Sequence, residues 1–225
     1  MALKHSLFAL AALATAATAQ AQIGAALTAD LGTTGAGVHL VVPMERNLNG
    51  RFGANTFTHD FDKRSGTVDY KLDGKLATFD VLFDWYVVPH SSFRLTGGIL
   101  YNGNRFKALG TPNASGSFSF NGNTYASTDL GALKGEVSFR RAAPYVGIGW
   151  GNALTPDRRW NFNADIGVFH QGKARVNLIA YGCTSSAAFC TQLAKDVDAE
   201  EKRLQEDASD FQVYPVLRAG ISYSF

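Results

Sequence analysis

The fold is decided by FQVYPVLRAGISYSF, residues 211–225. Every second residue from Val213 to Phe225 is apolar, and the residues between them are largely polar or small. Alternation with a period of two predicts a β-strand with one apolar face. A strand that ends the chain on an aromatic residue in this way is typical of a closed barrel, in which the apolar face meets lipid and the other face lines the interior.

The N-terminus has the pattern of a secretory signal peptide. Lys4 and His5 form a polar start, residues 7–14 form a short apolar core, and the small residues at 17–21 fit a cleavage site. The core is too short for the roughly 20 apolar residues of a transmembrane helix. We therefore expect residues 1–21 to be removed and residues 22–225 to form one β-barrel domain.

Charge and hydropathy argue against a nucleic-acid-binding protein and against a protein with transmembrane helices. Removal of Lys4 lowers the formal net charge from +2 to +1, which favours neither nucleic acid nor an acidic partner. No mature stretch is apolar over 18 residues, so we expect no transmembrane helix. An exported chain rich in short alternating segments fits a barrel, and a soluble β-sandwich is the alternative.

The number of strands depends on two segments. If residues 25–42 and 133–150 each form one strand, the alternating segments give eight strands, and splitting both gives ten. Residues 25–30 are shorter than the roughly 9–11 residues that a spanning strand needs. We therefore expect a closed antiparallel transmembrane barrel of eight strands, with ten as the alternative.

Two other segments depart from the strand pattern. Residues 108–130 are rich in Gly, Ser, Asn and Thr and predict a long loop with a small hairpin at Asn121-Gly122. Residues 191–207 have no Gly or Pro and predict an amphipathic helix before the last strand, with Thr191 as its N-cap. An even strand count places this helix outside the cell.

The non-apolar face of the strands carries nearly all of their charge. Because an Arg or Lys facing lipid at the bilayer midplane costs roughly 2–4 kcal/mol, this face should line the barrel interior. Asp84 and Arg94 flank one turn on that face and are the clearest predicted pair. The predicted network in the lumen consists of Arg51, Asp80, Asp84, Arg94, Lys134, Glu136, Arg140, Asp165, Arg175 and Arg218.

The chain contains two cysteines, Cys183 and Cys190. Export places them in an oxidising compartment, which favours a disulfide that closes the small loop between them. Further ligands with metal-binding spacing are missing around them, so we expect no metal site.

The signal peptide, the alternating strands and the terminal Ile221-x-Tyr223-x-Phe225 together resemble small outer-membrane β-barrel proteins of Gram-negative bacteria. The resemblance covers essentially the whole mature chain. It implies export through the periplasm to the outer membrane and contact with outer-membrane lipid and lipopolysaccharide. It also implies that Ile221, Tyr223 and Phe225 form the signal read by the barrel-insertion machinery.

This resemblance leaves the activity open, because one fold hosts many functions. We expect no catalytic residue and no cofactor, and a structural or interacting role through residues 108–130 and 183–210, with an extracellular ligand that is not identified. One alternative is a narrow channel whose lumen charges select small polar solutes. Another is a lipid-modifying enzyme, because His90-Ser91-Ser92 resembles the His-x-Ser spacing of outer-membrane lipid A deacylases, although here it lies in a turn after Pro89.

Overall fold

The computed structural model describes residues 24–65, 68–89, 91–112, 116–126, 129–155 and 159–225. The predicted signal peptide lies outside the described residues. The strands and helices run in the order β1 Ala26–Gly32, β2 Gly35–Glu45, β3 Leu48–Ser65, β4 Val68–Trp85, β5 Phe93–Asn102, β6 Arg105–Pro112, β7 Ser117–Phe120, β8 Asn123–Ala126, β9 Ala132–Ser138, β10 Ala142–Trp150, β11 Trp160–His170, β12 Arg175–Tyr181, α2 Ala187–Asp207, the 3-10 helix η2 Ala208–Asp210, and β13 Val213–Ser224.

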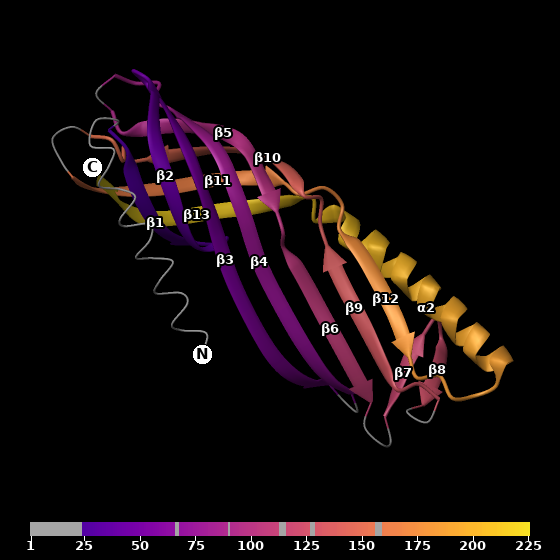
Figure 1. The fold of residues 1–225 in the computed structure, drawn as a ribbon. Coiled ribbons are helices and arrows are strands. Elements are labelled where there is room, and N and C mark those ends of the chain that lie inside the picture. Colours follow the sequence, from indigo (N-terminus) through magenta and orange to yellow (C-terminus); the bar gives the residue numbers. More distant parts are fainter. Residues whose placement is uncertain (1–23, 66–67, 90, 113–115, 127–128, 156–158) are drawn as a thin grey trace.

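Eight antiparallel strands form a closed barrel in the order β1-β2-β3-β4-β5-β10-β11-β13, and β13 returns to β1 (Figure 1). The last strand therefore pairs with the first, with Ala29 opposite Ile221. Pairing of β4 with β5 completes the ring, with Phe79 opposite Tyr101. A closed ring leaves no strand edge unpaired within the barrel. The predicted fold class and the count of eight are confirmed, and the ten-strand alternative is wrong.

The eight strands that form the barrel are not the same eight segments that the sequence predicts. Residues 25–42, expected as one strand, make a tight turn before Gly35, whose φ of +100° is readily adopted only by glycine. Backbone hydrogen bonds from Phe225 N to Ala25 O and from Thr33 N to Leu217 O extend the pairing of the short β1 with β13 beyond both ends of the strand. Residues 25–42 therefore supply two barrel strands where one was expected. The count stays at eight because β12 lies outside the barrel and pairs only with β9 among the described strands.

The remaining strands build a sheet extension on one end of the barrel. Strands β3 and β4 are each 18 residues long and run past the barrel rim, and β6, β9 and β12 add to the outer half of β4 (Figure 1). The predicted strand at 133–150 is therefore two strands, since β9 belongs to the extension and β10 to the barrel. We use "sheet extension" for β6, β9 and β12 with residues 57–65 of β3 and 68–76 of β4.

A helix and a hairpin cover one face of the sheet extension. Helix α2 lies along β12, and the β7–β8 hairpin lies at the far end of the extension (Figure 1). The predicted hairpin is present, with Asn121 and Gly122 at its turn, both at positive φ. Phe118, Phe120 and Tyr125 of the hairpin region pack against Leu193 and Val197 of the helix. This pair of elements is termed the helix–hairpin unit.

The outward face of the barrel is apolar over its whole circumference. Among the described residues, no helix has the length and apolar character needed to cross a membrane. Large exposed apolar side chains occur on every barrel strand, those of β3 lying in the part that runs into the sheet extension, and they include Val38, Phe79, Phe83, Ile99, Val146, Phe162, Ile166 and Leu217.

Candidate functional site

Four charged side chains meet in the barrel interior at the level of Arg51. Its Nη1 lies 2.9 Å from Asp165 Oδ2, and its Nη2 lies 3.1 Å from Asp84 Oδ1. Arg94 completes the group, with Nη2 2.7 Å from Asp165 Oδ1 and Nε 3.4 Å from Asp84 Oδ1. The four residues come from β3, β4, β5 and β11 and form the Arg–Asp cluster. Two positive and two negative charges balance, as buried ions require.

A second polar group surrounds His39, which is 0% exposed. Its Nδ1 lies 2.7 Å from Asp30 Oδ2, and its Nε2 lies 3.1 Å from Asp80 Oδ2. Arg218 Nη2 lies 2.7 Å from the same oxygen of Asp80, and Asn55 Nδ2 donates to it at 3.0 Å. Both ring nitrogens of His39 therefore face carboxylates, which leaves neither available as a general base toward a substrate.

Apolar side chains fill the interior on either side of these polar groups. Toward the sheet extension, Phe169 and Tyr214 stack with ring centres 4.9 Å apart. They belong to a packed group with Leu82, Leu100, Ala143, Tyr145 and Val216. At the other end, the connection after β10 places Ala153 against Ala26 and Val41. The cavity beside the Arg–Asp cluster has a volume of about 10 Å³, roughly the space of one water molecule.

Six of the ten residues predicted to face the lumen do so, and they form these two groups: Arg51, Asp80, Asp84, Arg94, Asp165 and Arg218. Asp84 and Arg94, predicted as a pair, are in contact. The other four, Lys134, Glu136, Arg140 and Arg175, lie outside the barrel and correct that prediction. Lys134, Glu136 and Arg175 do alternate with apolar residues along their strands, but β9 and β12 belong to the sheet extension. Arg140 lies in the connection between β9 and β10.

Sequence reasoning missed Asp30 and Tyr145 as interior residues. Asp30 lies in residues 25–42, a segment interrupted by Gly32, Gly35 and Gly37, where alternation alone does not assign the interior face. Tyr145 fits inside because Gly147 and Gly167 lie beside it, and a Cβ on either glycine would come within 2.6 Å of its hydroxyl. The repeated glycines of Gly147-Ile148-Gly149 were the available signal, since small interior positions make room for large neighbours.

The sheet extension contains an apolar cleft next to the barrel, with a volume of about 380 Å³. Phe57, His59 and Phe61 stack in a row along β3, with successive ring centres 6.2 and 5.7 Å apart. Phe106 of β6 lines the same cleft. Phe57 and Phe61 are 50% and 47% exposed, so their rings are available to a ligand or partner.

The helix–hairpin unit is joined by one buried carboxylate. Asp196 of α2 accepts hydrogen bonds from Asn121 Nδ2 at 3.1 Å, from Asn123 Nδ2 at 2.7 Å and from the Tyr125 hydroxyl. The Tyr125 hydrogen bond, followed by those of the two amides, lowers the pKa of Asp196 to about 2. Burial and this carboxylate raise the pKa of Tyr125 to about 12. The sequence segments 108–130 and 183–210, singled out separately, thus form one unit.

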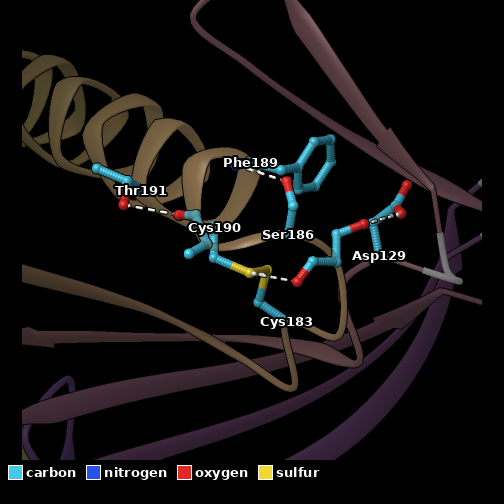
Figure 2. The surroundings of a disulfide bond; sticks show 8 residues. Asp129, Cys183, Ser186, Phe189, Cys190 and Thr191 are labelled. Atoms are coloured by element: carbon cyan, nitrogen blue, oxygen red, sulfur yellow. Dashed lines mark hydrogen bonds between the residues drawn. A yellow bond between two sulfur atoms is a disulfide. The ribbon is translucent and has the colours of Figure 1, made fainter.

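A disulfide joins Cys183 to Cys190 in the first turn of α2, with the Cα atoms 5.9 Å apart (Figure 2). The helix begins at Ala187, and Ser186 caps it by accepting from Phe189 N at 3.3 Å. The predicted cap at Thr191 is wrong, because Thr191 lies inside the helix and donates to Ala187 O. Ser185 donates to Asp129 Oδ1 at 3.0 Å, which ties the loop to the segment after β8.

The terminal motif lies at the barrel rim opposite the sheet extension. Tyr223 contacts Trp160 and Phe225, with ring centres 4.9 and 5.4 Å apart. Phe93 and Trp150 form another pair at the same rim, where β5 begins and β10 ends. These aromatic side chains form a girdle of the kind that barrels place at a membrane interface.

The residue group considered for lipid-modifying chemistry is His90-Ser91-Ser92. His90 lies outside the described residues, so its placement relative to Ser92 stays a prediction. Among the residues that the structure describes, no group of three or more His, Cys, Asp or Glu side chains is arranged to hold a metal ion.

No protein-family model and no curated protein sequence matches the chain. Several solved structures resemble it, among them two from Acinetobacter baumannii. The structure of CarO2 from Acinetobacter baumannii matches with a TM-score of 0.58 and 17% identity, over 90% of this chain and 99% of that one. The structure of CarO from the same species matches with a TM-score of 0.55 and 20% identity, over 90% of this chain and 97% of that one. At these identities the likeness shows the fold, which is an eight-stranded barrel with a helix before the last strand.

Proposed function

We propose that this chain is an integral outer-membrane protein of a Gram-negative bacterium, exported through the periplasm, with a closed lumen and no enzymatic activity. The apolar outward face supports membrane insertion, because side chains such as Phe162 and Trp160 are 83% and 63% exposed. A belt of this kind in water would forgo roughly 25 cal/mol for every Å² of apolar surface left exposed. Lipid is the solvent that removes this cost.

The proposed orientation follows from the even strand count. In such barrels the short turns face the periplasm and the long connections lie outside the cell. The sheet extension and the helix–hairpin unit would then be extracellular, and Ile221, Tyr223 and Phe225 would lie at the periplasmic rim for the barrel-insertion machinery. The apolar cleft and the helix–hairpin unit are the proposed interaction surfaces, because binding commonly falls on the connections of a rigid scaffold.

The Arg–Asp cluster is the observation that carries the assignment of a closed lumen. Its four side chains cross the interior and contact one another, and the adjoining cavity holds about one water molecule. An eight-stranded barrel is only wide enough for its interior to be filled by side chains. A continuous path for hydrated solutes would require the cluster to separate.

The test is conductance of the refolded protein in a planar lipid bilayer, after heat-modifiable gel migration has confirmed a folded barrel. We expect no steady openings, either from the natural sequence or from a Lys195→Ala control. Steady, charge-selective openings that change with Arg94→Ala or Asp84→Ala would make the protein a channel. In parallel, altered lipid A in membranes of a deletion strain would favour the lipid-modifying alternative.

A further inference from the structure

A second concave surface lies where the sheet extension leaves the barrel, at the junctions of β5 with β6 and of β9 with β10. Its volume is about 780 Å³. Asp73 is the one carboxylate among the described residues that line it. Six cationic residues line this surface, which is termed the basic groove: Lys75, Arg105, Lys107, Arg140, Arg141 and Arg175.

Strand register explains why these charges gather. Lys75 lies opposite Arg105, and both Arg105 and Arg175 lie opposite Ser138, so these residues form one row across four strands on one face of the sheet. Like charges opposite each other on one face repel. Arg105 is partly neutralised by Glu136, with Nε 3.2 Å from Oε1. The groove as a whole keeps a clear excess of positive charge.

The basic groove adjoins the apolar belt of the barrel. Tyr101 lines the groove and lies opposite Phe79, which belongs to the belt. Arg141 donates to the Tyr101 hydroxyl, and its guanidinium carbon lies 5.7 Å from the centre of the ring. The cationic side chains therefore begin where the exposed apolar side chains end, on the outward face and at the rim nearer the sheet extension.

We propose that the basic groove binds the phosphate group of an anionic lipid of the outer leaflet. The proposal rests on the membrane insertion and orientation given above. Guanidinium groups bind phosphate oxygens in a bidentate manner, and cationic groups at a membrane surface attract anionic headgroups. The acyl chains of the same molecule would lie against Tyr101 and Phe79. A free phosphate would use only the charged half of this surface, so an amphiphile is the better fit.

The test uses the refolded full-length chain in phosphatidylcholine nanodiscs and measures retained lipid by native mass spectrometry. The probes are bisphosphorylated lipid A, the same lipid with its phosphates removed, and inorganic phosphate. We expect retention of the phosphorylated lipid, at least tenfold weaker retention of the dephosphorylated lipid, and a steep loss of binding with added salt. Heat-modifiable migration of each sample shows separately whether the barrel has folded and inserted, so failure of the membrane assignment is distinguished from failure of the lipid site.

The matched variants carry three substitutions each. Arg140→Gln/Arg141→Gln/Arg175→Gln removes half of the groove cations and should weaken retention at least tenfold. Lys195→Gln/Lys202→Gln/Arg203→Gln removes the same charge from the exposed surface of α2 and should leave retention unchanged. Equal retention by both variants, equal retention of dephosphorylated lipid, or equally strong binding of inorganic phosphate would each overturn the proposal. If the groove variant fails to fold, the comparison of the three probes on the natural sequence still tests whether the groove binds a lipid phosphate.

Discussion

Arg51 and Asp165 form a bidentate pair across the barrel interior, with Nη1–Oδ2 at 2.9 Å and Nη2–Oδ1 at 3.2 Å. They come from β3 and β11, which are separated around the ring by β2, β1 and β13. The pair therefore joins walls of the barrel that share no backbone hydrogen bonds. Such pairs hold a geometry in place, although the cost of burying them offsets much of their attraction.

Replacing Asp165 by alanine should strongly destabilise the barrel. Arg51 and Arg94 both contact this carboxylate, so its loss leaves two buried guanidinium groups with reduced compensation. Removal of one partner from a buried pair costs about 3–5 kcal/mol. The measurement is the urea midpoint of unfolding in detergent micelles, with Lys195→Ala on the exposed surface of α2 as the control. Equal midpoints for the two variants would show that the Arg–Asp cluster does not support the fold.

The barrel and the polar character of its interior could be predicted because both follow from a period of two. Residues such as Asp80 and Asp84 share a face with Arg94 through simple alternation and register. The sheet extension could not be predicted in this way. Lys134 and Arg175 alternate with apolar neighbours as regularly as barrel residues do, because a sheet covered on one face gives the same pattern as a barrel in lipid. A barrel strand and a strand of the sheet extension differ in the strands with which they pair, and alternation alone does not reveal these partners.

The helix–hairpin unit shows a different limit. The helix and the hairpin turn are local features, and both were recognised from residue type. Their union depends on Asp196 meeting Asn121, Asn123 and Tyr125, which are more than 70 residues away in the chain. A single charged residue on an amphipathic helix is normally solvated, so nothing in the sequence distinguished Asp196 from Asp198 beside it.

Replacing Gly149 by alanine should disturb the Arg–Asp cluster without removing a charge. A Cβ at this position would lie 2.7 Å from both Arg94 Cζ and Asp165 Oδ1, so the ion pair would have to shift. Overpacking of this kind costs about 1–3 kcal/mol. Gly97→Ala on β5 is the matched control, because its Cβ would meet nothing nearer than Tyr145 O at 4.0 Å. The measurement is the midpoint temperature of thermal unfolding of each variant. Equal decreases in this midpoint for Gly149→Ala and Gly97→Ala would contradict this account.

Acid should release the β7–β8 hairpin from α2. Hydrogen bonds to the Asp196 carboxylate hold its pKa at about 2, below its ordinary value of 3.8. A lowered pKa in the folded state stabilises the unit above the unfolded pKa, and this contribution is lost as the pH falls from about 4 toward 2. Pepsin cleavage near the hairpin, followed across this range, should therefore rise as the pH falls.

The same experiment on Asp196→Asn provides the contrast. This variant should be cleaved readily even at pH 5, because its neutral amide has one acceptor oxygen, where the carboxylate accepts through Oδ1 from Asn121 and through Oδ2 from Asn123 and Tyr125. Asp198→Asn, an exposed position on the same helix, should behave like the natural sequence. Identical acid profiles for all three proteins would rule out Asp196 as the link.

The outer edge of β12 is closed by side chains rather than by another strand, and its exposure should cause self-association. Glu201 Oε2 accepts from Leu178 N at 2.7 Å, and Gln205 Oε1 accepts from Val176 N at 3.0 Å. An open edge of this kind is a template for pairing with another chain. Glu201→Ala/Gln205→Ala should therefore form dimers and larger species in detergent, measured by sedimentation velocity. Lys202→Ala/Glu206→Ala, on the exposed surface of the same turns, should remain in the state of the natural sequence. If both variants sediment as the natural protein does, the contacts from α2 are not what protects this edge.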